Sequence, residues 1–61
     1  MEATNKGYKV ETILVDLSPK QLFYLLVVSK DGETLFNQEY PYYLMSEEEI
    51  MSIGLSYTEV L

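Results

Sequence analysis

The first regular pattern along the chain is a loose alternation of hydrophobic and polar residues from Tyr8 to Leu17. Side chains of a strand point alternately to its two faces, and this segment is rich in β-branched residues, which favour strands. The pattern therefore predicts a strand. The polar residues 1–7 before it predict a flexible leader. After it, Ser18 to Gln21 predicts a turn, because Pro19 suits the second position of a type I turn.

The segment from Leu22 to Val28 is continuously apolar and permits two interpretations. A strand here would be buried on both faces, either centrally in a sheet or at a subunit interface. A helix over residues 19–28 would begin well, because Ser18 and Gln21 have the spacing of a capping box. The sequence Asp31-Gly32 favours the strand, since this pair is typical of a two-residue hairpin turn with positive φ at both positions.

Such a turn also predicts the register of the hairpin, with Val28 opposite Leu35. The return strand from Glu33 to Tyr40 should end at Pro41, which has no amide hydrogen for the ladder. In this register the predicted core face carries Phe23, Leu25, Val27, Phe36 and Tyr40. The opposite face is half exposed, could pair with a copy of itself, and carries Tyr24, Leu26, Val28 and Leu35.

The second half of the chain carries the strongest local signal, that of a short helix. Ser46 as N-cap and Glu49 three residues later form a capping box, and Met45 with Ile50 forms a hydrophobic staple. The glutamates 47–49 lie in the first turn, where the helix dipole favours negative charge.

Gly54 predicts the end of this helix, because glycine readily adopts the left-handed conformation of a helix stop. The helix would then span residues 47–53, and Leu55 to Val60 predicts a last short strand. Together these elements predict an α+β fold, a small antiparallel sheet of three to four strands with one short helix packed on it. A single domain would cover residues 8–61.

Composition limits how such a domain can be stabilised. A chain of 61 residues forms one small core, and the absence of cysteine and histidine excludes disulfides and soft-ligand metal sites. With 48% hydrophobic residues, the chain is too apolar for a disordered protein. Self-association, most simply as a homodimer, is therefore expected, and no cofactor or metal is expected.

Charge is unevenly distributed along the chain, which has a net charge of −6. Residues 31–61 contain no lysine or arginine but hold Asp31, Glu33, Glu39, Glu47, Glu48, Glu49 and Glu59. Such a surface cannot neutralise phosphates, so a basic protein is the expected partner and nucleic acid is not. No apolar run approaches the ~20 residues of a membrane span, and the first residues lack a signal peptide's apolar region. We therefore expect a cytoplasmic protein that binds no membrane.

The residue types favour contact with a partner over catalysis. The chain has no histidine or cysteine, and its hydroxyl groups have no evident base beside them, so an enzyme is not expected. Three adjacent glutamates project about 100° apart on a helix and cannot converge on one ion without a neighbouring subunit. Tyr40, Tyr42 and Tyr43 are more informative, because tyrosine is enriched at contact surfaces. Adjacent side chains in an extended segment point apart, so one of Tyr42 and Tyr43 should be exposed.

Between Leu25 and Gly54 these features occur in a particular order: a hairpin closed by Asp31 and Gly32, an aromatic return strand with carboxylates, and a Leu-Met-Ser N-cap before an acidic helix. This order resembles the short, acidic, dimeric inhibitors of uracil-DNA glycosylase that small bacteriophages encode. The resemblance implies a DNA mimic whose acidic side chains replace phosphates. It also implies a hydrophobic pocket for the apolar side chain that the enzyme inserts into DNA.

Carried over by position, the resemblance implies a host uracil-DNA glycosylase as partner and a specific set of contact residues. The implied phosphate mimics are Glu39, Glu47, Glu48 and Glu49. The implied pocket residues are Ile50, Met51 and Ile53, with Tyr40, Tyr42 or Tyr43 near the rim. The family has an aromatic residue in this helix and a long last strand, whereas this helix has none and the last strand is short.

Two alternatives remain at this stage. A second alignment places Tyr8, Lys9 and Val10 on the family's first strand and Glu49 and Ile50 on its last, which would displace the helix residues. A different function is also compatible with the charge: inhibition of another nucleic-acid enzyme, such as a nuclease or RNA polymerase, or a structural or assembly module whose acidity serves solubility.

Overall fold

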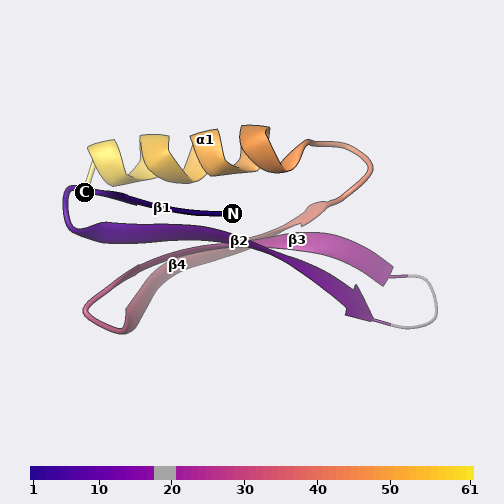
Figure 1. Ribbon diagram of the computed structural model, residues 1–61, viewed down its shortest axis with the longest axis horizontal. Helices are drawn as coiled ribbons and strands as arrows, with labels where there is room; N and C mark the ends of the chain where they lie inside the picture. Colours follow the sequence, from indigo (N-terminus) through magenta and orange to yellow (C-terminus); the bar gives the residue numbers. More distant parts are fainter. Residues whose placement is uncertain (18–20) are drawn as a thin grey trace.

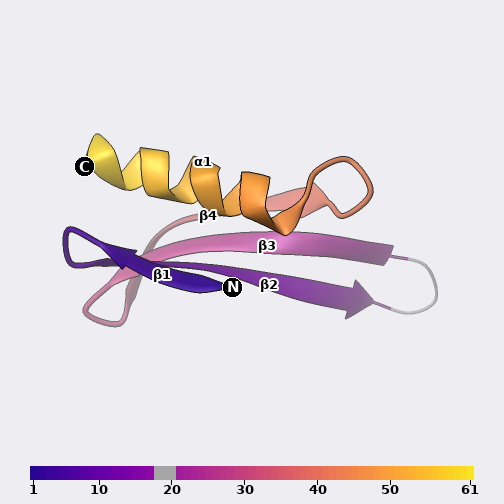
Figure 2. The same cartoon turned by 45° about the horizontal axis from the view of Figure 1, so that its top comes forward.

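In the computed structural model, residues 1–17 and 21–61 are described, and they form one antiparallel sheet of four strands and one α-helix. The elements are β1 (Glu2–Asn5), β2 (Tyr8–Leu17), β3 (Gln21–Lys30), β4 (Glu33–Pro41) and α1 (Glu47–Glu59). The strands lie in the sheet in chain order. Helix α1 lies along one side of this sheet (Figures 1 and 2). The predicted α+β class is therefore confirmed.

The apolar segment 22–28 lies in strand β3, between β2 and β4. The strand interpretation is confirmed and the helix over 19–28 is wrong. The central position accounts for only part of the apolar run: Leu26 and Val28 are buried on one face, whereas Phe23, Leu25 and Val27 on the other are half-buried by neighbouring side chains. The turn predicted to begin at Ser18 lies at 18–20, outside the described residues.

The leader expected over residues 1–7 is wrong, because residues 2–5 form the edge strand β1. Strand β1 pairs with β2 through a two-residue turn at Lys6 and Gly7, whose φ angles are 55° and 82°. The predicted turn at Asp31 and Gly32 has the same form, with φ angles of 52° and 80°. Lysine is not a usual residue for positive φ, which is why the first turn has a weak sequence signal.

The register of the β3–β4 hairpin changes partway along. Next to the turn, Ser29 pairs with Thr34 as expected, but Val28 pairs with Phe36. Leu35 is left without a partner, so the hairpin contains a β-bulge. One extra residue moves all later side chains of β4 to the opposite face. Phe36 and Tyr40 therefore share a face with Val28, and the predicted core face, which grouped them with Phe23, Leu25 and Val27, is wrong.

The core lies between the sheet and α1. Within the described residues, its fully buried members are Val10, Leu26 and Val28 from the sheet and Ile50 from the helix, with Met51 only 7% exposed. Phe36 and Tyr57 close one part of it, with ring centroids 4.6 Å apart. Burying one such aliphatic side chain stabilises a fold by about 1.5–3 kcal/mol, so this small set has a large share of the stability.

Helix α1 continues well beyond the predicted stop. Gly54 lies in its middle with helical backbone, and residues 55–59, predicted as a strand, form its last turns. A Cβ atom on Gly54 would lie 2.5 Å from Cγ1 of Val10 and 2.8 Å from Cδ1 of Leu26. Glycine is therefore required here for close approach of helix to sheet, not for a left-handed turn. In the described part of the chain, no helix is long and apolar enough to cross a membrane.

Candidate functional site

A surface groove runs between strand β1 and helix α1. One part has a volume of about 400 Å³ and is lined by Met1, Glu2, Ala3, Glu48, Met51, Ser52 and Leu55. The neighbouring part, of about 430 Å³, shares Ala3, Ser52 and Leu55 and is further lined by Thr4, Asn5, Ser56 and Glu59. We call this continuous feature the β1–α1 groove.

The β1–α1 groove combines apolar and acidic side chains. Its first part is lined mainly by methionine, alanine and leucine carbon atoms, with Glu2 and Glu48 among them, and Glu59 lies in the second part. Of the residues that line either part, none is lysine or arginine. An apolar surface with carboxylates beside it is complementary to an apolar side chain flanked by basic ones.

Strand β1 also has unpaired backbone groups beside the groove. The amide of Thr12 donates to the carbonyl of Met1 at 2.9 Å, so the bonds to β2 involve alternate residues of β1, Ala3 and Asn5 among them. In an antiparallel pair the intervening residues direct their N–H and C=O groups away from the partner strand. The groups of Glu2 and Thr4 therefore point to the free edge, where an extended partner segment can bond to them.

Glu47 ties the start of the helix to the sheet. Its carboxylate accepts a hydrogen bond from the Thr12 hydroxyl at 2.6 Å and one from the amino group of Met1 at 2.9 Å. The hydrogen bond from Thr12, together with the Met1 amine, holds the pKa of Glu47 below its usual value of 4.5. This carboxylate is occupied within the molecule, so it is poorly placed to replace a DNA phosphate.

In residues 1–17 and 21–61, Glu49, like Glu47, has its carboxylate bonded within the molecule, whereas Glu48 does not. Glu49 accepts from the amide of Ser46 at 3.0 Å, while the Ser46 hydroxyl accepts from the amide of Glu49 at 3.1 Å. This predicted capping box is confirmed, and its bonds lower the pKa of Glu49. Among the described residues, no side chain bonds to the exposed Glu48 carboxylate. Of the three glutamates, Glu48 is the one free to bind a partner.

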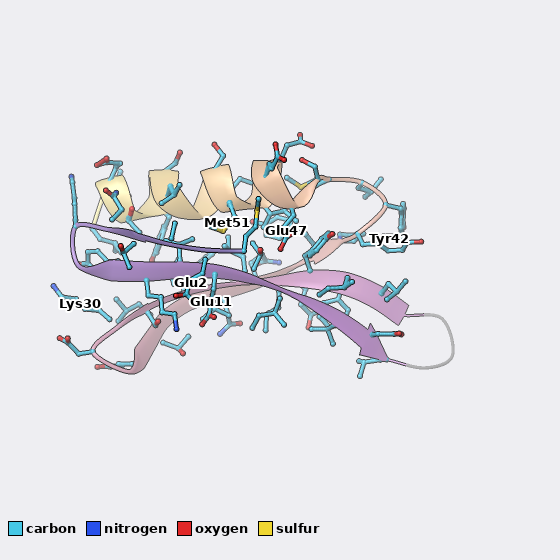
Figure 3. The ribbon with its side chains drawn as sticks, viewed as in Figure 1. Glu2, Glu11, Lys30, Tyr42, Glu47 and Met51 are labelled. Carbon is cyan, nitrogen blue, oxygen red and sulfur yellow. The ribbon has the colours of Figure 1, made fainter. Side chains whose placement is uncertain are left out.

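The three helix residues expected to line a pocket have different surroundings. Ile50 is fully buried in the core, which corrects its assignment to a partner-binding surface. Met51 is also nearly buried, yet it contributes to the wall of the β1–α1 groove. Ile53 is 37% exposed but does not line the groove. Figure 3 shows Met51 and Glu47 on the first turns of α1, above Glu2 and Glu11 of the first two strands.

The tyrosines form a second exposed feature, in the loop between β4 and α1. Tyr40 is half-buried against the core, whereas Tyr42 and Tyr43 are 47% and 74% exposed. Their rings meet edge to face, with centroids 6.0 Å apart. Both are thus exposed, where at least one was expected, and Leu44 beside them is exposed too. We call residues 42–44 the aromatic loop; Tyr42 lies beyond the start of α1, away from the groove residues (Figure 3).

The remaining predicted residue, Glu39, lies apart from both features. It pairs with Leu25 and therefore lies on the sheet face opposite α1. The expected contact set is thus divided among the groove, the aromatic loop and the uncovered face. Sequence reasoning missed Glu2, Ala3 and Leu55, because it recognised neither β1 nor the second half of the helix. Residues 2–5 contain one apolar residue, Ala3, so Gly7 alone indicated a turn there.

The uncovered face of the sheet is strongly apolar. We call it the open face; its central side chains on β2 and β3 are Ile13, Val15, Leu17, Phe23, Leu25 and Val27. Ile13 and Leu17 are 43% and 50% exposed, and the other four are half-buried by their neighbours. Among the described residues, its charged side chains lie at the margins. Lys9 lies 3.6 Å from Glu2 and 3.9 Å from Glu11 at one margin, and Glu39 lies beside Leu25 on the edge strand β4.

Comparisons with known proteins add no family to this description. A scan against protein-family models, a search of curated proteins and a search of solved structures each found no match. Within residues 1–17 and 21–61, no group of three or more His, Cys, Asp or Glu side chains is arranged to hold a metal ion.

Proposed function

We propose that this chain is a non-enzymatic inhibitor that binds the DNA-binding surface of a basic protein, with a bacterial uracil-DNA glycosylase as the specific candidate. The β1–α1 groove takes up an apolar side chain of the partner. Glu48 faces the basic residues that normally contact phosphates, whereas Glu2 and Glu59 already pair with Lys9 and Lys6 within the chain. The exposed aromatic loop supplies a second contact.

The observation that carries this proposal is the composition of the groove. Its apolar wall, made by Ala3, Met51 and Leu55, lies beside the free carboxylate of Glu48, and no lysine or arginine lines it. Proteins that bind DNA present basic residues around apolar side chains that contact or separate bases. The free edge of β1 adds backbone N–H and C=O groups. These can bond to the backbone of an extended partner segment, whatever its side chains are.

The carboxylates have separate roles in this proposal. Glu48 acts on the partner, so its neutralisation should slow association and reduce its dependence on salt. Glu47 and Glu49 act on the helix itself, through Thr12 and Ser46. Changes at those two positions should lower stability more than they change the charge seen by the partner.

The test is a uracil-excision assay with a bacterial uracil-DNA glycosylase and an equimolar amount of the protein, combined with gel filtration. We expect loss of excision and a stable complex. Glu48→Lys should weaken inhibition at least ~10-fold, because it reverses a charge at the contact. Asp31→Lys is the matched control, since it makes the same charge reversal at a distant exposed turn, and Lys6 adopts the same positive φ in the other two-residue turn. Full excision without a complex would exclude this enzyme as target.

The open face favours a second candidate function, an assembly module. Such a module would leave excision unchanged, and Glu48→Lys would then alter no binding event. Inhibition of another nucleic-acid enzyme, a nuclease or RNA polymerase, predicts the intermediate result. Excision would persist, but a purified basic enzyme of that kind would be inhibited in a manner sensitive to Glu48.

A further inference from the structure

The open face leaves large apolar side chains on the surface of a very small protein. Phe23, Leu25 and Val27 lie on the strand whose alternate residues, Leu26 and Val28, form the core. Helix α1 covers the other side, and Figure 2 shows the lower side of the sheet without a covering element in the described chain. A strip this apolar and continuous is typical of an interface.

The chain has few other means of stabilisation. Its core contains five buried apolar residues in the described part, and there is no cysteine for a disulfide. Domains of this size bury only about 60% of the surface of the unfolded chain. Covering the open face would bury a second set of apolar side chains as numerous as the first.

We propose that the open face is a homodimer interface, in which two copies pack these faces against each other about a two-fold axis. The product is a two-layer sheet sandwich with the layers about 10 Å apart, and one helix on each outer side. Both β1–α1 grooves stay accessible, because each groove is beside the outward helix. The dimer is therefore independent of the inhibitor function.

The size and charge of the face fit a second copy. Strands spaced ~4.8 Å apart with a rise of ~3.3 Å per residue give a face of roughly 500–600 Å² per copy, or about 1,000–1,200 Å² for two, close to the lower limit of specific interfaces. The charges lie at the margins: Lys9 partly neutralises Glu2 and Glu11 at one, and Glu39 lies on the edge strand β4 at the other. The apolar centres can therefore meet when the Glu39 side chains of the two copies lie at opposite margins.

Two properties follow from these observations. An interface near the lower size limit is typical of weak association, so the dimer should dissociate on dilution. Each copy has a net charge of −6, so the copies repel each other and salt should strengthen the dimer. A complex with a basic partner would respond to salt in the opposite direction. Salt dependence thus separates self-association from partner binding.

The experiment is sedimentation equilibrium across a range of concentrations, at low and high salt, on the wild-type chain and two variants. Ile13→Glu places a charge in the centre of the open face, and we expect a dissociation constant at least ~10-fold higher. Leu14→Glu is the matched control, because Leu14 is the next residue, is 53% exposed and points to the other face. It should leave the dimer unchanged.

A second measurement does not depend on the folding of a variant. In a mixture of isotope-labelled and unlabelled wild-type chains, NMR should detect contacts between copies at Ile13, Leu25 and Phe23. A monomer at every concentration would overturn the proposal. It would also be overturned if contacts between copies occurred at the aromatic loop, or if Leu14→Glu dissociated the dimer while Ile13→Glu did not. A monomer whose open face is covered only on addition of the basic enzyme would assign that face to the partner.

Discussion

The two faces of this sheet have nearly the same hydrophobicity and very different surroundings. Leu25 and Leu26 are adjacent on β3, yet Leu26 is fully buried beneath α1 and Leu25 lies on the open face. The covered face is the more polar one at its centre, because Thr12 lies there between Val10 and Leu14. Apolar content alone therefore does not decide which face receives the helix.

Specific contacts make that selection. The Thr12 hydroxyl bonds to Glu47 at 2.6 Å, and the Asn5 side-chain amide donates to the Thr58 hydroxyl at 2.8 Å, so both ends of α1 are fixed to the covered face. Between them, Gly54 allows the helix to approach Val10 and Leu26. In the described residues, the open face has no such polar anchors, which suits a surface that associates with another chain.

The largest test of this difference is a pair of alanine substitutions on β3. Leu26→Ala should lower the free energy of unfolding by about 2–5 kcal/mol, since it leaves a cavity in a fully buried site. Leu25→Ala should cost about 1 kcal/mol when measured on dilute protein, where no second copy covers it. Urea unfolding followed by circular dichroism gives both values. Equal costs would show that the faces are equally important within one chain.

A smaller effect is expected from Gly54→Ala. The added methyl group would overlap Val10 and Leu26, at a cost of about 1–3 kcal/mol, while alanine regains up to ~1 kcal/mol of helix propensity. The net loss of stability should be about 1–2 kcal/mol. Ser56→Ala, at an exposed position of the same helix, is the control and should be neutral or slightly stabilising. A stabilised Gly54→Ala variant would contradict the close approach of helix and sheet.

The sequence predicted where most strands and the helix begin better than it predicted which face of the sheet each side chain occupies. The strand β2, the strand β3 and the start of α1 at Ser46 follow from local patterns that act over a few residues. The bulge at Leu35 could not be predicted, because it depends on how two strands fit over a common core, and one extra residue reverses the face of Phe36 and Tyr40.

The predictions of a helix stop at Gly54 and of the contact residues were incorrect for a related reason. A glycine near a helix end has the same sequence signal whether it stops the helix or permits close packing, and the distinguishing atoms belong to Val10 and Leu26, far away in the chain. The separate roles of Glu47, Glu48 and Glu49 likewise depend on Thr12 and on the unrecognised strand β1. The sequence located the acidic segment but could not distinguish its bound carboxylates from the free one.

The smallest expected effect is on the stability of the fold at acidic pH. Hydrogen bonds from Thr12 to Glu47, from the Ser46 amide to Glu49, and from Lys6 to Glu59 lower the pKa of each carboxyl below 4.5. Groups with a pKa lowered by folding stabilise the fold above the unfolded value, and this stabilisation is lost as the pH falls below about 4.5. The urea midpoint should therefore be constant near neutral pH and decline in that acidic range. Glu47→Gln should reduce the decline, and an identical pH profile would contradict its role as an anchor of the covered face.

The bulge has one more consequence, for how far association can proceed. Strand β4 has a free edge, and exposed edges of this kind invite further strands and, in the limit, fibres. Here Leu35 interrupts the ladder near one end, and Pro41 lacks an amide hydrogen at the other. Only the short run from Phe36 to Tyr40 remains regular enough to pair with an added strand. The same residue that turns Phe36 toward the core thus shortens the regular part of this free edge, which should limit the addition of further strands there.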